Sequence, residues 1–135
     1  DGRLAVSNVK HESFAVAQWQ AMLGNVELID AKALPLDDDR IRCDDLGCVF
    51  RRGSTVIAMP IVDMAALEDC ERADVVIAPF TINECPSAKH IIDRQALDLH
   101  GAHALHFEGN NVRIEYARET RGARPWSAGW KDEYN

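Results

Sequence analysis

The sequence has no long apolar segment, and this excludes a membrane-spanning helix within its 135 residues. Such a helix needs about 20 consecutive apolar residues, whereas the run VVIAPF at 75–80 is far shorter. An initiator methionine and a secretory signal peptide are also missing. We therefore expect the chain to be a piece of a longer protein, and its localisation must be inferred from its cysteines or from the parent.

Internal repeats and linker-like breaks in composition are missing too, which indicates a single domain. Hydrophobic residues make up 47% of the chain, enough to build one core and to exclude general disorder. We expect one α/β domain over residues 1–117, followed by an extended or loosely ordered tail over 118–135.

The chain lacks an excess of positive charge. Its net charge is −7, so the chain as a whole is not expected to attract nucleic acid or anionic lipid. The acidic residues gather in LPLDDDRIRCDD and DMAALEDCERAD, whereas the last quarter of the chain is more basic. A local basic edge is therefore compatible with the acidic whole.

Motifs of several common enzyme classes do not occur. There is no G-x-S-x-G around a serine, no C-x-x-C pair and no glycine-rich phosphate loop. Serine hydrolysis, thiol redox chemistry and nucleotide binding by a phosphate loop therefore have no support, and no cofactor is expected.

Four cysteines are the most informative residues present. Cys43 and Cys48 flank a short acidic turn, and Cys70 and Cys85 flank an apolar run. A zinc site, free buried cysteines and two disulfides are the three interpretations. The even count favours disulfides, which are typical of proteins outside the reducing cytosol. Sequence alone allows three connectivities, and we prefer the local pairing because each pair brackets a turn or a strand return.

The apolar pattern predicts short strands alternating with short helices. Strands are predicted over 3–9, 26–29, 48–50, 54–59, 73–79, 87–93, 102–107 and 111–117. Helices are predicted over 11–23, 63–70 and 94–101, and residues 33–45 are predicted to form a loop. Two of the strand pairs are predicted hairpins. Together these elements favour a mixed-sheet α/β sandwich.

Particular residues are predicted to cap helices and fill the core. Asp63 and Asp93 are predicted N-caps, and Gly101 is predicted to end the last helix. In the middle helix, Ala66 and Leu67 are predicted to face inward. The predicted core consists of Val56, Ile57, Val75, Val76, Ile77 and Leu105.

Two sets of residues could bind a metal ion. His100, His103 and His106 would lie on one side of a helix. However, Gly101 is predicted to end the helix there, and on a strand the last two histidines point to opposite faces. Surface histidines are therefore favoured over a shared metal. The second set is an acidic loop that contains Asp37, Asp38, Asp39, Asp44 and Asp45. This loop lacks the spaced pattern of a calcium site, so we favour the interpretation that it is a solvated loop.

The basic tail is the first candidate for contact with DNA. Arg118, Arg121 and Arg124 recur every three residues and are followed by Trp126. Arginines pair with phosphates, and exposed indoles stack on unpaired bases. The alternative is that Trp126 packs on the core and the arginines meet the domain's own acidic surface. A second candidate is the pair Arg51 and Arg52, at the tip of a predicted hairpin.

The order of the motifs resembles one family. The chain reads DGRLAVSN, FAVAQWQAMLGN, RCDDLGCVFRRGSTVIAMP, ALEDCERADVVIAPF, CP, IIDRQALDLHGAHALHFEGNNVRI and RGARPW. This succession resembles the C-terminal domain of ComEC-type competence proteins, the DNA-internalisation channels of transformable bacteria, in the shorter variant of alphaproteobacteria. In the family this region is a metallo-β-lactamase-like domain. The sequence departs from the family pattern, because it has no H-x-H-x-D-H signature. It also has no histidine in Thr81–Ser87, where the metal-binding form of the family has histidines.

The resemblance implies a reduced, degenerate metallo-β-lactamase-like fold without bound metal. It implies a non-catalytic extracytoplasmic (periplasmic) domain of an inner-membrane DNA-uptake channel, which positions DNA or the channel. The implied partners are single-stranded DNA, the membrane-embedded remainder of the polypeptide and other competence proteins. Two alternatives stay open. One is a metal-dependent nuclease that uses the histidines and the acidic loop; the other is a partner-docking module, which predicts an exposed apolar patch.

Overall fold

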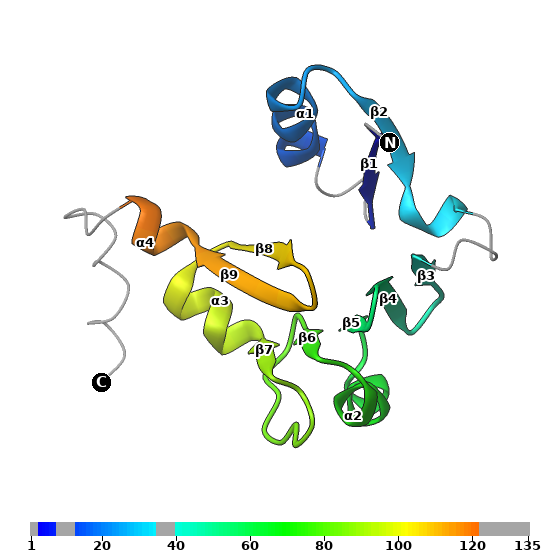
Figure 1. Ribbon diagram of the computed structural model, residues 1–135, viewed down its shortest axis with the longest axis vertical. Helices are drawn as coiled ribbons and strands as arrows, with labels where there is room; N and C mark the ends of the chain where they lie inside the picture. Colours follow the sequence, from blue (N-terminus) through cyan, green and yellow to red (C-terminus); the bar gives the residue numbers. More distant parts are fainter. Residues whose placement is uncertain (1–2, 8–12, 35–39, 122–135) are drawn as a thin grey trace.

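The computed structural model describes residues 3–7, 13–34 and 40–121, and for residues 120 and 121 it describes the backbone alone (Figure 1). Strands and short helices alternate along this part of the chain, so the predicted mixture of α and β structure is confirmed. The strands form one five-stranded sheet and two separate pairs. No helix of the described part is both long and apolar enough to cross a membrane.

The five-stranded sheet is the centre of the fold. Its order is β3-β4-β5-β6-β7, with antiparallel pairing from β3 to β5 and parallel pairing from β5 to β7. The predicted mixed sheet and the hairpin around Gly53 are therefore confirmed. Its strands are β3 (Ile41–Cys43), β4 (Gly47–Arg52), β5 (Thr55–Pro60), β6 (Val75–Ile77) and β7 (His90–Ile92).

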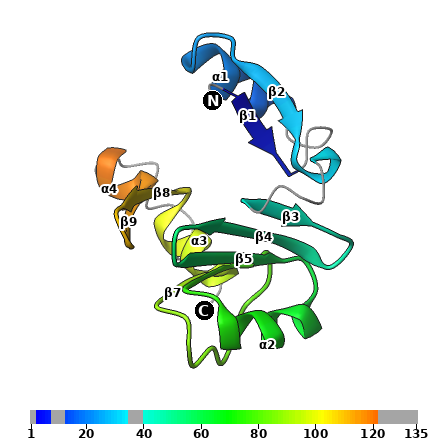
Figure 2. The ribbon, with the colours of Figure 1, turned by 45° about the vertical axis from the view of Figure 1, so that its right-hand side comes forward.

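One face of this sheet is covered by α2 (Asp63–Arg72) and the loop after β6 (Figure 2). Ala58 and Val76 of the sheet pack against Cys70 of the helix and the adjoining Ala73, and all four are buried. Cys85 and Ile82 of the loop pack on the same cluster. This face is built largely from small side chains, so α2 lies close to β5 and β6.

The opposite face is covered by a hairpin and a helix. The hairpin consists of β8 (His103–Glu108) and β9 (Asn111–Tyr116), and the helix is α3 (Arg94–His100). Ile57, Val75 and Ile92 form the buried centre of this cluster, and larger side chains of the hairpin and α3 pack on it: Leu97, Leu105, Phe107, Val112 and Ile114. Both faces of β6 are therefore covered, which explains its continuous apolar sequence.

The predicted core is confirmed in its central residues. Val75 and Val76 have no exposed surface and Ile57 is 5% exposed. The other three, Val56, Ile77 and Leu105, are partly buried and pack around these centres.

Both ends of α3 are determined by residues next to the helix in the sequence. The Asp93 carboxylate accepts a hydrogen bond from the Ala96 amide at 2.9 Å, which satisfies an N-terminal amide of the helix. Gly101 ends the helix with a φ of 76°, a region that favours glycine. Both predictions for this helix are confirmed. For α2 the N-cap is Val62, whose side chain makes no capping hydrogen bond, so the prediction of Asp63 as N-cap is wrong. Asp63 lies in the first turn and accepts a hydrogen bond from the Met64 amide at 2.9 Å.

Three further details differ from the sequence predictions. Residues 41–43 form strand β3 inside the predicted loop, because they pair with β4 across a tight turn. Leu67 is 70% exposed, because the contact face of α2 runs through Ala66 and Cys70 instead. Residues 118–121, the start of the predicted extended tail, belong to helix α4 (Ala117–Arg121), which packs against α3 and β9.

The N-terminal segment forms a small unit of its own, drawn in blue in Figure 1. In it, β1 (Arg3–Val6) pairs in parallel with β2 (Glu27–Asp30), and α1 (Ser13–Met22) connects them. The short helix η1 (Ala31–Ala33) follows and lies against β3. Val16 is the one buried residue of α1. The helix thus leaves large apolar side chains exposed, among them Phe14, Trp19 and Met22.

Candidate functional site

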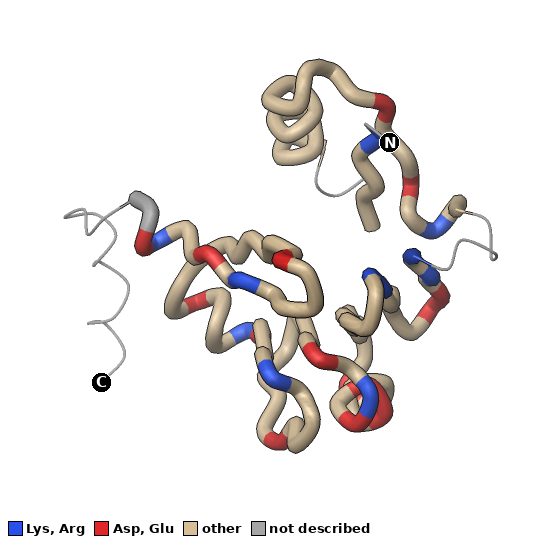
Figure 3. Tube along the Cα trace, viewed as in Figure 1, with Lys and Arg blue, Asp and Glu red and all other residues tan. Residues whose placement is uncertain are grey.

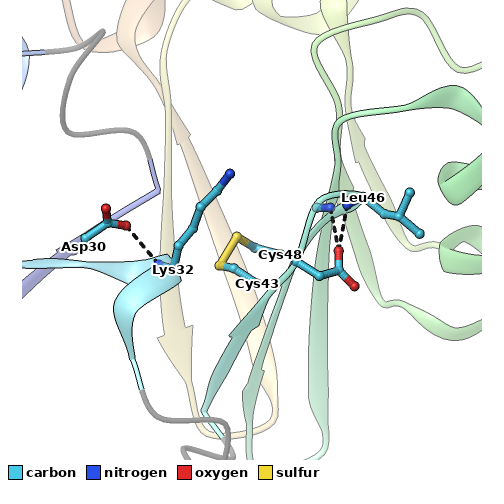
Figure 4. Close-up of a disulfide and its surroundings, with 7 residues drawn as sticks. Asp30, Lys32, Cys43, Leu46 and Cys48 are labelled. Atoms are coloured by element: carbon cyan, nitrogen blue, oxygen red, sulfur yellow. Dashed lines mark hydrogen bonds between the residues drawn. A yellow bond between two sulfur atoms is a disulfide. The ribbon is translucent and has the colours of Figure 1, made fainter.

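The cysteines form two disulfides, and no cysteine is free. Cys43 and Cys48 are opposite one another in the β3–β4 register, with their Cα atoms 4.0 Å apart (Figure 4). The turn between them is held by the Asp44 carboxylate, which accepts hydrogen bonds from the amides of Leu46 at 2.8 Å and Gly47 at 3.0 Å. At Gly47 a Cβ would collide with the Met59 carbonyl on β5, so only glycine fits there.

The second disulfide joins α2 to the loop after β6. Cys70 is 2% exposed and bonds to Cys85, 15 residues later. This bond holds the loop against the sheet face on which α2 lies. Two disulfides in one small domain are typical of proteins that fold in an oxidising, extracytoplasmic compartment.

A groove runs between α2 and the strands from β3 to β5. We call it the α2 groove; its volume is about 610 Å³, and its lining includes Val49, Val56 and Ala58 on the sheet and Ala65 on α2. These small side chains leave the space open. A concave site of this volume falls in the range typical of ligand pockets, roughly 300–1,000 Å³.

The α2 groove is lined by charges of both signs. Its arginines are Arg42, Arg51 and Arg72, and its carboxylates are Asp44, Glu68 and Asp69. The lining is therefore balanced in charge.

Carboxylates of α2 and of the β3–β4 turn lie close together in the groove. The pKa of Asp69 is raised, first by burial and then by the negative charges of Glu68 and Asp44, and Arg72 offsets part of this effect. Arg72 forms an ion pair with Glu68 at 2.9 Å. A cation placed in this part of the groove would relieve the repulsion among the carboxylates.

Two other carboxylates serve the fold. Asp74 accepts a hydrogen bond from the Val56 amide at 2.9 Å and pairs with Lys89 at 3.0 Å, so it ties β5 to the start of β7. Its pKa is lowered, chiefly by the Val56 amide and then by the Lys89 ammonium group. Asp93 is 7% exposed and accepts a second hydrogen bond from the Ile82 amide at 3.0 Å.

The three histidines lie near one another in sequence but have different roles. The Nδ1 atom of His103 lies 2.8 Å from the Gly101 carbonyl, and both His100 and His103 pack on the Tyr116 ring. His106 is on the opposite face of β8, 3.2 Å from a carboxylate oxygen of Glu115. The predicted opposite orientation of the last two histidines is therefore confirmed. Among residues 3–7, 13–34 and 40–121, no three or more His, Cys, Asp or Glu side chains form a group that could hold a metal ion.

The predicted DNA-contacting arginines are divided among several places. Arg118 donates a hydrogen bond to the Leu99 carbonyl at 2.9 Å and so joins α4 to α3. The side chain of Arg121, the residues Arg124 and Trp126, and Asp37, Asp38 and Asp39 of the acidic loop lie outside the described residues.

The hairpin arginines lie on opposite faces of β4. Arg52 places its guanidinium 5.2 Å from the centre of the Phe107 ring, a cation–π contact on the face covered by β8 and β9. Arg51 is exposed and lines the α2 groove. Of the predicted set, Arg51 is thus the described arginine best placed to meet a ligand.

The sequence analysis missed the α2 groove and a set of exposed apolar side chains. Leu46, Ile61, Met64 and Leu67 are each more than half exposed. The sequence analysis predicted that Leu67 faces inward and made no prediction for Met64; their position in an otherwise acidic helix was a usable signal of exposure.

Comparisons of the chain with protein-family models, with curated proteins and with solved structures find no match. The resemblance to competence proteins therefore stays a prediction that rests on the order of the sequence motifs.

Proposed function

We propose that this chain is a non-catalytic, disulfide-stapled extracytoplasmic domain of a ComEC-type DNA-uptake channel, where it positions DNA or the channel. The observation that carries the proposal is the pair of disulfides, Cys43–Cys48 and Cys70–Cys85, because such bonds are typical of domains in an oxidising compartment. The order of the sequence motifs supports the choice of family. In this proposal, the mixed sheet covered on both faces is a reduced metallo-β-lactamase-like fold.

The proposed DNA contacts are local, because the net charge of −7 opposes general attraction to phosphate. Arg51 supplies one contact from the edge of the α2 groove. Arg121, Arg124 and Trp126 supply the others. Arg118 is not included, because its guanidinium is already bonded within the fold.

The test is binding and cleavage of labelled single- and double-stranded DNA by the purified chain. We expect single-stranded DNA to bind with an affinity that falls as salt rises, and we expect Arg51→Ala and Arg121→Ala each to weaken it. Arg113→Ala is the matched control, because Arg113 pairs with Glu108 and Glu115 on the outer face of the hairpin. Binding that is absent, or equally weakened by the control, would contradict a role in DNA contact.

The same assay tests the nuclease alternative. Reactions with Mn²⁺, Mg²⁺ or Zn²⁺ are run beside reactions with EDTA. We expect intact DNA in all of them. Metal-dependent degradation that persists after repurification would replace the proposal with a nuclease, and His100, His103 and His106 would then be the first residues to substitute.

A second candidate function is a module that docks another polypeptide. The observation that favours it is the exposure of large apolar side chains on α1 and α2, including Met22 at 84% and Met64 at 81%. Apolar patches on a soluble surface commonly mark sites of protein association.

A further inference from the structure

The Cys43–Cys48 disulfide lies where the N-terminal part of the chain meets the five-stranded sheet. We call β1, α1, β2 and η1 together the N-terminal unit. Its last element, η1, lies against β3, which is the edge strand that contains Cys43. Figure 4 shows Lys32 of η1 beside the bond. The disulfide therefore fixes the strand on which the N-terminal unit rests.

The N-terminal unit has little core of its own. Among its described residues only Val6, Val16 and Ala31 are buried. Its sheet consists of the two parallel strands β1 and β2. A two-stranded sheet with so few buried side chains is not expected to be stable alone. The order of the unit should therefore depend on how firmly β3 is held.

Strand β3 is the outermost strand of the sheet and is only three residues long. Main-chain hydrogen bonds continue on both sides of it, from the Asp44 amide to the Gly47 carbonyl at 2.9 Å and from the Arg51 amide to the Arg40 carbonyl at 2.7 Å. Short ladders at the edge of a sheet open locally at a low cost in free energy. The cross-link to β4 therefore contributes much of what keeps β3 in place.

The two disulfides differ in what must move before a thiol can attack them. Cys70 is 2% exposed, and it packs with Cys85 on the core cluster beneath α2. Attack on that bond requires α2 or the loop after β6 to leave the sheet. Cys43 is partly exposed on the edge strand, so a local opening of β3 is sufficient.

Basic residues gather around the Cys43–Cys48 bond. Figure 3 shows them on η1, on β4, and on and just before β3. They are Lys32, Arg40, Arg42, Arg51 and Arg52. The carboxylate of Asp44, next to Cys43 in the sequence, is bonded to the amides of the turn. Positive charge near a cysteine favours its thiolate form, which makes its sulfur a better leaving group when a thiol attacks the disulfide.

We propose that the Cys43–Cys48 disulfide is a redox-sensitive latch for the N-terminal unit. When the bond is closed, it holds β3 on β4 and thereby supports η1. When a dithiol reduces it, β3 loosens and the N-terminal unit loses its support. The strands from β4 to β7 and the Cys70–Cys85 bond keep their places. The inference is independent of the proposed contact with DNA.

The reduction is an exchange of disulfides with a dithiol reagent or a dithiol protein. One thiolate of the dithiol attacks a sulfur of the bond and forms a mixed disulfide, and the other cysteine leaves as a thiolate that takes up a proton. The second thiolate of the dithiol then displaces the remaining cysteine, which is also protonated. Two electrons and two protons pass to Cys43 and Cys48, and the dithiol becomes a disulfide.

The first experiment measures which disulfide is reduced first in the folded full chain. The chain is exposed to graded dithiothreitol, free thiols are alkylated, and mass spectrometry reports each cysteine pair. We expect Cys43–Cys48 to be reduced at least about tenfold faster than Cys70–Cys85. Equal rates, or faster reduction of Cys70–Cys85, would overturn the proposal.

The second experiment measures hydrogen exchange before and after selective reduction of Cys43–Cys48. We expect the amides of β2 and η1 to be protected in the oxidised chain and to exchange about tenfold faster once the bond is reduced, whereas β5 and β6 stay unchanged. Unprotected β2 and η1 in the oxidised chain, unchanged exchange after reduction, or equal acceleration in β5 and β6 would each overturn the proposal.

Matched double substitutions separate the latch from the other bond. We expect Cys43→Ser/Cys48→Ser to show fast exchange in β2 and η1 without reductant and no further response to dithiothreitol. Cys70→Ser/Cys85→Ser is the control and should keep the response. A response that persists in the first variant would overturn the proposal. Far-UV circular dichroism checks that both variants are folded, and the measurements on the parent chain decide the question if one is not.

Discussion

Removal of the disulfide between Cys70 and Cys85 should cost more stability than removal of the other one. A cross-link restricts the unfolded chain, and its contribution grows with the length of the loop that it closes. The loop of 15 residues between Cys70 and Cys85 corresponds to about 3 kcal/mol, and the loop of 5 residues between Cys43 and Cys48 to about 2 kcal/mol.

The burial of Cys70 increases the expected difference in stability loss between the two disulfides. Cys70 is 2% exposed and packs with Cys85 among Ala58, Ala73 and Val76, so replacement by alanine also leaves space in the core. We expect Cys70→Ala/Cys85→Ala to lower the free energy of unfolding by about 3–4 kcal/mol. Cys43→Ala/Cys48→Ala should lower it by about 2 kcal/mol.

Urea denaturation of the two double variants and the parent, without reductant, measures both values. A smaller loss at Cys70/Cys85 than at Cys43/Cys48 would refute the reasoning, because loop length and burial both point the other way. A loss below about 1 kcal/mol at Cys70/Cys85 would show that the loop after β6 keeps its place without the cross-link.

Two further substitutions test single carboxylates of the fold. Asp93→Ala removes the cap of α3 and the bond to the Ile82 amide, so we expect a loss of about 2–4 kcal/mol in urea denaturation; a loss under about 1 kcal/mol would contradict this role. Asp74→Asn tests pH dependence. The pKa of Asp74 is lowered in the folded chain, so its charge stabilises the fold above the ordinary carboxyl pKa, and this contribution is lost as the pH falls through the lowered pKa. The difference in unfolding free energy between the parent and Asp74→Asn should be constant near neutral pH and shrink below about pH 4; a difference that grows toward acid pH would contradict the assignment.

The features that the sequence predicted well are those decided by near neighbours in the chain. The hairpin between β4 and β5 turns at Gly53, the one between β8 and β9 turns at Gly109, and both glycines have positive φ. Asp93 and Gly101 delimit α3 for equally local reasons. In each case the deciding interaction joins residues a few positions apart, so the sequence pattern contains it.

The features that the sequence predicted poorly depend on contacts between residues that are far apart in the chain. β3 is three residues long and is a strand because β4 pairs with it, which no pattern of three residues reveals. The exposed position of Leu67 depends on how α2 lies across β5, and that follows from the small Ala58 on the sheet. The α2 groove arises in the same way, from side-chain sizes on strands and a helix that meet only after folding.

The switch of the sheet from antiparallel to parallel pairing at β5 has a consequence for how the chain folds. The strands from β3 to β5 pair within 20 residues of sequence, so they close short loops and should form early. The strands β6 and β7 join through longer crossovers and should follow. During oxidative folding, therefore, Cys43 and Cys48 should become protected from thiol-modifying reagents before Cys70 and Cys85, whose sulfur atoms meet only once α2 lies on the sheet.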